Sequence, residues 1–174
     1  TWDEELGVDL GVAPGIATLE PLEVQGSIPE VQERLTRTLA SLLDRGAFPL
    51  ILGGEHSLTP GAVRAASQRF PGLTVLQIDA HADLRDGYQG HADSHASAMR
   101  RCLDDPSLRV VGVGIRSMSA AEARFAAQNP DRVRHFLARG RRWTAREVLA
   151  AVSGPVYLSV DLDGLDCSLL PATG

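Results

Sequence analysis

Residues 73–83 read Leu-Thr-Val-Leu-Gln-Ile-Asp-Ala-His-Ala-Asp, a mostly apolar run that ends in charged side chains. The run Leu73 to Ile78 predicts a buried strand, because apolar and β-branched residues dominate it. Asp79, His81 and Asp83 follow at every second position, so on an extended chain their side chains point to the same face. This stretch therefore predicts a strand that delivers three polar side chains to one end of a sheet.

Segments on both sides of this stretch alternate between strand and helix patterns. Further strands are predicted at Phe48 to Leu52, Val110 to Ile115, Arg132 to Leu137 and Pro155 to Val160. The predicted helices are Ser27 to Gly46, Thr59 to Arg69, His95 to Leu103, the segment capped by Ser119 and Glu122, and Thr144 to Val152. Residues 1–26 read as loop or a weak strand. This alternation predicts an α/β fold, a three-layer, open, mostly parallel sheet with helices on both faces.

The composition of the 174 residues excludes several chemistries. Because 17 basic residues stand against 22 acidic ones, the formal charge is −5, which argues against a broad nucleic-acid surface. All the basic residues are arginines, so neither a Schiff-base lysine nor a P-loop lysine is present. No apolar run approaches the roughly 20 residues that span a bilayer. The two distant cysteines, Cys102 and Cys167, favour a reduced, cytoplasmic setting.

Three polar clusters follow predicted strands, and such positions meet at one edge of a parallel sheet. They are Gly53 to Ser57, Asp79 to Asp83, and Asp161 to Asp166. For each cluster alone, a structural role as a helix cap, turn or loop residue is as consistent with the sequence as a functional role. Together, their carboxylates would repel one another unless a cation lay among them, since an unpaired buried charge costs on the order of several kcal/mol.

The donor set indicates which ions would bind. The candidate ligands exceed the four that one tetrahedral zinc needs, and they are His56, Asp79, His81, Asp83, Asp161 and Asp163. Imidazoles and carboxylates without thiolates suit two divalent ions, and oxygen-rich ligation favours manganese over zinc. The sequence thus predicts a two-metal site with bridging aspartates and ions about 3.5–4 Å apart.

The motifs Gly-Gly-Glu-His-Ser (53–57), Asp-Ala-His-Ala-Asp (79–83) and Ser-Val-Asp-Leu-Asp-Gly-Leu-Asp (159–166) resemble the three signatures of the ureohydrolase family, which includes arginase and agmatinase. The resemblance covers essentially the whole chain and keeps the family's order. It implies an open α/β fold with an eight-stranded parallel sheet, two manganese ions per subunit and a homo-oligomer. It also implies that His56, Asp79, Asp83 and Asp161 hold one ion, and that His81, Asp79, Asp161 and Asp163 hold the other.

The same resemblance implies a reaction. A hydroxide oriented by Asp83 attacks the carbon of a guanidinium group, and the intermediate collapses to urea and an amine. His95 matches a histidine that the family uses to move protons and position substrate, although a local hydrogen bond at a helix start is the other interpretation. The loop Asp86 to Gly90 with Ser94 to Ser97 resembles agmatinases. The implied substrate is therefore a small cationic guanidino compound, agmatine, with putrescine as the amine.

Other activities stay open as alternatives. They are another ureohydrolase (arginase, guanidinobutyrase or formiminoglutamase), a catalytically silent metal-binding homologue, and a two-metal hydrolase of phosphate esters. Cys167 motivates the silent homologue, because it stands where the family usually has proline and puts a thiol near the site. The resemblance implies that the family's first strand lies upstream of residue 1 and that its substrate-contacting glutamate lies beyond Gly174. We therefore expect residues 1–174 to form one partial ureohydrolase domain, incomplete at both ends.

Three more polar residues are interpreted without an assigned role. Glu55, beside His56, is either a supporting residue or a solvated loop carboxylate. His91 reads as a solvated loop residue, and His135 reads as a structural residue because it lies far from the motifs in sequence.

Overall fold

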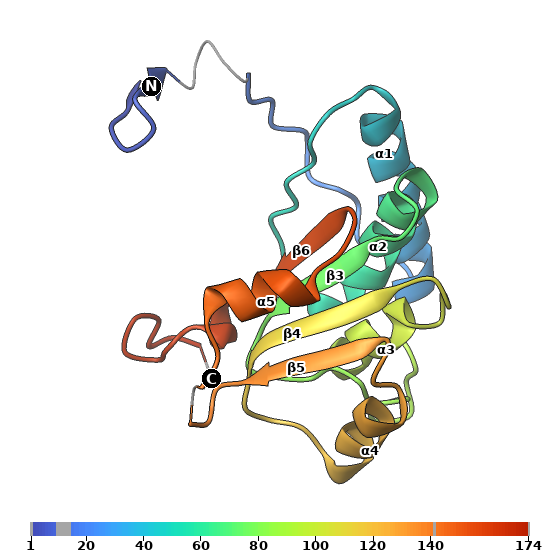
Figure 1. The fold of residues 1–174 in the computed structure, drawn as a ribbon. Helices are drawn as coiled ribbons and strands as arrows, with labels where there is room; N and C mark the ends of the chain where they lie inside the picture. Colours follow the sequence, from blue (N-terminus) through green and yellow to red (C-terminus); the bar gives the residue numbers. More distant parts are fainter. Residues whose placement is uncertain (1, 10–14, 141, 174) are drawn as a thin grey trace.

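The computed structural model describes residues 2–9, 15–140 and 142–173, and a parallel sheet of four strands lies at its centre (Figure 1). The order across the sheet is β5 (Val133–Leu137), β4 (Arg109–Ile115), β3 (Thr74–Ile78) and β6 (Val156–Val160). The central strand β3 pairs with β4 on one side and with β6 on the other, in parallel register. The predicted open α/β fold is confirmed.

Helices cover both faces of this sheet. One face carries α2 (Thr59–Arg69), α3 (Ala98–Cys102) and α4 (Ala120–Gln128), and the other carries α5 (Ala145–Ala151). Neighbouring strand residues point to opposite faces, so Val110 belongs to the core under α2 and α3, whereas Val111 packs with Phe136 and Val148 under α5.

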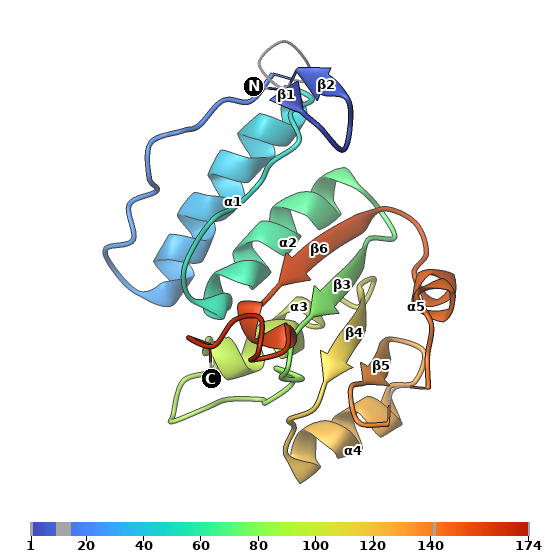
Figure 2. The same cartoon turned by 90° about the vertical axis from the view of Figure 1, so that its left-hand side faces the viewer.

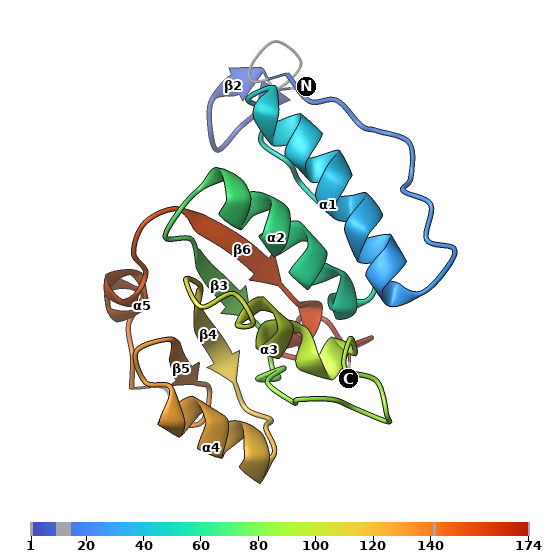
Figure 3. The same cartoon turned by 90° about the vertical axis from the view of Figure 1, so that its right-hand side faces the viewer.

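The helix α1 (Ile28–Asp44) lies alongside α2, beyond the edge of the sheet that β6 forms (Figures 2 and 3). Its residues Leu35 and Leu39 pack against Ala62 and Ala65 of α2. The two helices approach closely at Gly61, where an added Cβ would lie 2.6 Å from the carbonyl oxygen of Gln32. This contact holds the first turn of α2, and the residues just before it, against α1.

Three helices begin at the predicted capping boxes. The backbone N–H of Ser119 donates to Glu122 at 2.7 Å, and that of Thr144 donates to Glu147 at 2.7 Å. The N–H of Ser27 likewise donates to Glu30 at 2.7 Å. These carboxylates satisfy donors that a helix start otherwise leaves unpaired.

The predicted strand Phe48 to Leu52 is wrong. These residues have no regular structure, and Phe48, Leu50 and Leu52 are 94%, 78% and 86% exposed. A strand needs a neighbour that supplies its hydrogen bonds, and none of the described strands pairs with this segment. The apolar pattern alone does not create the strand.

Other boundaries differ by a few residues. Thr59 lies inside α2, whose cap is Leu58, and the helix predicted from His95 begins as a 3-10 turn (His95–Ser97) before α3. Residues 1–26 contain a small hairpin of β1 (Trp2–Asp3) and β2 (Val8–Asp9), and residues 10–14 lie outside the described residues. The implied eight-stranded sheet is represented by four strands in the part of the chain that the structure describes.

His135 is a structural residue of β5, as the sequence predicts. It lies opposite Gly112 of β4, where an added Cβ would come 2.8 Å from the imidazole Cδ2 atom. Its buried Nε2 atom makes no hydrogen bond within the described residues. Burial lowers the pKa of His135 below its ordinary value, an effect that the charge of Glu122 partly offsets.

This environment predicts a contribution of His135 to acid lability. Because its folded pKa lies below the unfolded one, the unfolded state binds more protons as pH falls below about 6.5, and stability is lost in that window. In full-length protein, His135→Leu should reduce the slope of unfolding free energy against pH by up to about 1.4 kcal/mol per pH unit. Denaturant titrations from pH 8 to 5 measure it, and equal slopes for both proteins would contradict the assignment.

Candidate metal centre

The predicted ligands come together where β3 and β6 end. Asp79 follows β3 and Asp161 follows β6, and the backbone N–H of Asp161 donates to the carbonyl oxygen of Ile78 at 2.9 Å. His56 begins the 3-10 turn His56–Leu58, which leads directly into α2. Two parallel strand ends and one helix start therefore supply the side chains, as expected for ligand sites in open α/β sheets.

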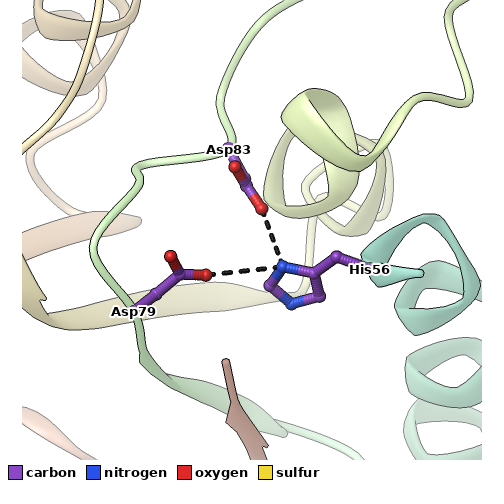
Figure 4. A group of neighbouring side chains, drawn as sticks. All are labelled: His56, Asp79 and Asp83. Carbon is purple, nitrogen blue, oxygen red and sulfur yellow. Dashed lines mark ion pairs between the residues drawn. The ribbon is translucent and has the colours of Figure 1, made fainter. Parts of the chain in front are cut away.

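One group consists of His56, Asp79 and Asp83 (Figure 4). The Nδ1 atom of His56 lies 2.8 Å from an oxygen of Asp83 and 3.4 Å from an oxygen of Asp79. Although this nitrogen is buried, it has no hydrogen bond of acceptable geometry. An imidazole nitrogen and two carboxylates directed at one point, without a good hydrogen bond among them, match the needs of a cation.

A second group consists of Asp79, His81 and Asp163. The Nδ1 atom of His81 lies 2.9 Å from an oxygen of Asp163 and 3.8 Å from one of Asp79. Asp79 thus belongs to both groups, and each of its two oxygens faces a different histidine. This is the arrangement that a bridging carboxylate between two ions requires.

Asp161, the second predicted bridge, lies at the rim of this arrangement. One of its oxygens is 3.7 Å from Nδ1 of His56, and the other accepts the backbone N–H of Asp163 at 3.1 Å. Its side chain is 36% exposed, whereas that of Asp79 is fully buried. The structure therefore brings five of the six predicted ligands into two compact groups and leaves Asp161 next to the first.

The backbone around the site is tightly built. Gly164 lies so close to Asp79 that an added Cβ would come 2.7 Å from the backbone nitrogen of Asp79. Asp83 has a φ of 51°, in the left-handed region that residues other than glycine rarely adopt. Such a conformation persists only where the surroundings impose it, and here it turns the Asp83 carboxylate toward His56.

Electrostatics at the site favour a cation. Burial, together with the nearby charge of Asp83, raises the pKa of Asp79 to about 7, although the N–H groups of His81 and Gln77 oppose this. For His56, burial acts to lower the pKa, but the contact with Asp83 and the charges of Asp83, Asp79 and Asp161 outweigh it and raise the pKa. The His56 shift shows the negative potential of the surrounding carboxylates, whereas burial is the main cause of the Asp79 shift. The residues present therefore fit divalent cations bound in each of the two groups.

Supporting side chains orient these ligands. The Nε2 atom of His56 lies 2.9 Å from the hydroxyl oxygen of Ser159, which leaves Nδ1 directed at the carboxylates. Gln77, fully buried in β3, donates from Nε2 to Asp79 at 2.9 Å and to the carbonyl oxygen of His81 at 3.0 Å. Sequence reasoning missed Gln77. Its signal was a carboxamide within an otherwise apolar strand, two residues before a ligand.

His95 lies beside the metal groups rather than within them. It lines a cavity of about 410 Å³ together with the six predicted ligands, Arg85 and Tyr88. Its Nδ1 atom is 3.0 Å from Glu55, and its ring contacts the ring of Tyr88 edge to face, with centroids 5.6 Å apart. This is not the local hydrogen bond that the sequence allowed as an alternative, because Glu55 lies 40 positions away in the chain, and the same ring also lines the cavity.

The remaining residues singled out in the sequence lie elsewhere. Cys167 is exposed and is not among the described residues that line the cavity. Cys102 is buried, and burial raises the pKa of its thiol to about 12. His91 is exposed in a turn, where its backbone pairs with that of Tyr88. In the described residues, no helix is both long and apolar enough to cross a membrane.

The fold and these side chains define a class, an open α/β protein with a candidate two-cation centre at the carboxyl ends of its strands. The chain belongs to the arginase family, whose model matches residues 4–174. The ureohydrolase resemblance of the motifs is thereby confirmed.

Two relatives and one crystal structure are similar to most of this chain. The chain is 36% identical to N(1)-aminopropylagmatine ureohydrolase of Thermus thermophilus, over 96% of this chain and 58% of that protein. It is 35% identical to an agmatinase of Bacillus anthracis, over 86% of this chain and 50% of that protein. The crystal structure of agmatine ureohydrolase of Thermoplasma volcanium superposes with a TM-score of 0.82 at 32% identity, covering 98% of this chain and 58% of that one. The chain thus spans between half and three-fifths of the length of these relatives.

The position of Gln77 predicts an effect on metal affinity. Gln77→Leu removes two donors that hold Asp79 and His81, so Mn²⁺ affinity should fall roughly 10- to 100-fold. Calorimetric titration of metal-free full-length protein measures this. Thr36→Val is the matched control, since the buried Thr36 hydroxyl donates to carbonyl oxygens between α1 and α2. An unchanged affinity in Gln77→Leu would refute the supporting role.

Proposed function

We propose that this chain carries the metal centre of a manganese-dependent amidinohydrolase that converts agmatine to putrescine and urea. The observation that carries the proposal is the position of Asp79, shared between two carboxylate–histidine groups beside a cavity that His95 also lines. Family membership supports the reaction class. Two bound Mn²⁺ ions would polarise the substrate and provide hydroxide at neutral pH.

The residues of the chain would bind the ions, orient the hydroxide and supply a proton. His56, Asp79 and Asp83 would hold one ion, His81, Asp79 and Asp163 the other, and Asp161 would complete both sets. Asp83 would accept a hydrogen bond from the attacking hydroxide and keep it aimed at the guanidinium carbon. His95, across the same cavity, would hold the proton that the departing amine requires.

The choice of agmatine does not rest on the charge of the cavity. Asp79, Asp83, Asp161 and Asp163 line it, but two divalent ions would neutralise these four carboxylates, and the fifth lining carboxylate, Glu122, lies 3.7 Å from Arg85. The choice rests on the similarity to agmatinases, and the formal charge of −5 on the chain agrees with a cationic substrate.

A second candidate substrate is N(1)-aminopropylagmatine. Relatives from Synechocystis and Thermus named as its ureohydrolases match over 99% and 96% of this chain. This compound adds an aminopropyl group to agmatine, and hence another cationic nitrogen. Homo-oligomer formation and a cytoplasmic setting stay predictions.

The substrate proposal is tested by incubating Mn²⁺-loaded full-length protein with agmatine, N(1)-aminopropylagmatine, arginine, guanidinobutyrate and formiminoglutamate. We expect urea from agmatine with the highest kcat/KM. A preference for N(1)-aminopropylagmatine would support the second candidate. Absence of urea or formamide from every compound would overturn the proposed function.

The second predicted bridge is tested separately. Asp161→Ala should lower kcat by more than about 100-fold and reduce bound Mn²⁺, because loss of a ligand costs more than loss of a supporting partner. Asp131→Ala, which changes an exposed carboxylate away from the cavity, is the matched control. Metal analysis and urea assays report both effects, and full activity of Asp161→Ala would exclude a bridging role.

A further inference from the structure

Glu55 is the residue of the Gly-Gly-Glu-His-Ser motif to which the proposed function gives no task. It precedes the 3-10 turn that begins at His56, and its side chain reaches the first residue of a second 3-10 turn, His95. One carboxylate oxygen lies 3.0 Å from Nδ1 of His95, and the other accepts a hydrogen bond from the hydroxyl of Ser57. Because Ser57 is buried, it anchors the carboxylate in place.

The His95 ring is held from two directions. Glu55 contacts the ring at Nδ1, and Tyr88 contacts it edge to face at an interplanar angle of 70°. Tyr88 is itself covered by the guanidinium of Arg85, 4.8 Å from the ring centroid. His95 and Tyr88 line the cavity, whereas Glu55 is not among the described residues that do. Among the described residues that line the cavity, His95 is the one to which the Glu55 side chain is hydrogen-bonded.

We propose that Glu55 is a positioning residue that keeps a proton on Nδ1 of His95, so that Nε2 is the atom that exchanges protons in the cavity. The inference rests on the proposed function for its catalytic consequence. A carboxylate beside Nδ1 accepts only from an N–H, and this selects the neutral tautomer whose Nε2 carries a lone pair. A proton taken up at Nε2 gives an imidazolium, and return of that proton to the departing amine restores the starting ring.

A purely structural ion pair predicts something different. The side chains of Glu55 and His95 are 51% and 57% exposed, and pairs this exposed contribute little to stability. Breaking a structural pair would leave the catalytic rate largely unchanged, even if the tautomer shifts. The proposed role changes the tautomer and the rate together, so the rates of the same variants separate the two interpretations.

The first test measures the tautomer directly. Metal-free full-length protein labelled with ¹⁵N-histidine is examined by NMR at alkaline pH, where imidazole rings are neutral, and His95→Gln assigns the signals. We expect a protonated Nδ1 and an unprotonated Nε2 on His95. Glu55→Ala should shift this ring toward the other tautomer, whereas Glu55→Gln, whose amide oxygen still accepts a hydrogen bond, should retain it. Glu33→Ala is the control, since Glu33 forms a comparably exposed ion pair with Arg64.

The second test measures the effect of Glu55 on the catalytic rate. In Mn²⁺-loaded enzyme, Glu55→Ala should lower kcat roughly 10- to 100-fold with KM changed less than about twofold, and Glu55→Gln should recover most of the rate. The double variant Glu55→Ala/His95→Ala should be no slower than His95→Ala, because both changes remove one function. Glu33→Ala should match the wild type.

Two outcomes overturn the inference. One is an unchanged His95 tautomer in Glu55→Ala, and the other is independent, additive rate losses in the double variant. If the proposed function is wrong, the result is different, because neither the wild type nor any variant then hydrolyses a guanidino compound. The NMR experiment requires neither metal nor substrate, so it decides the tautomer in that case as well.

Discussion

The burial of the Asp79 carboxylate at the end of the central strand is the constraint around which the site is organised. A fully buried carboxylate loses its hydration, and the nearby charge of Asp83 adds repulsion, so its pKa rises to about 7. Two groups donate hydrogen bonds to this carboxylate, the backbone N–H of His81 at 2.6 Å and the side-chain amide of Gln77 at 2.9 Å. These donors fix both oxygens but do not replace the lost hydration, and bound divalent cations would stabilise the charged carboxylate.

The sheet order makes this concentration of charge achievable. β6 pairs with β3 in parallel, so Asp161 and Asp163 leave the sheet beside Asp79 although more than eighty residues separate them in sequence. Gly164 then lets the turn after β6 close against the backbone of Asp79, where a side chain would collide. The position of the second ligand group is thus decided by backbone packing, before any side chain adjusts.

The sequence was informative where a local rule decides the structure. Capping boxes at Ser119 and Thr144 marked helix starts, and alternation in Asp79-Ala-His-Ala-Asp83 marked a common face. It was misleading at Phe48 to Leu52, because an apolar run reports the environment that suits it and not whether a neighbouring strand supplies one.

The sequence also could not predict hydrogen bonds between side chains that lie far apart along the chain. The bonds from Glu55 to His95 and from His56 to Ser159 join residues 40 and 103 positions apart. No periodicity or local motif encodes such pairs. Gln77 was the exception that a local rule could have found, since a buried carboxamide beside ligands requires acceptors.

The two histidines with separate proposed tasks share one mechanical support. His56 and His95 each open a 3-10 turn, the two turns pack together, and Glu55 is bonded to His95 while being the chain neighbour of His56. A displacement of the first turn therefore carries the carboxylate that orients the second histidine. Because the proposed metal ligand and the proposed proton-holding ring lie on turns that are bonded through Glu55, we expect the distance between them to vary less than if each stood on an independent loop. The relative position of the two histidines thus depends on the contacts between their turns as much as on the rigidity of the sheet below.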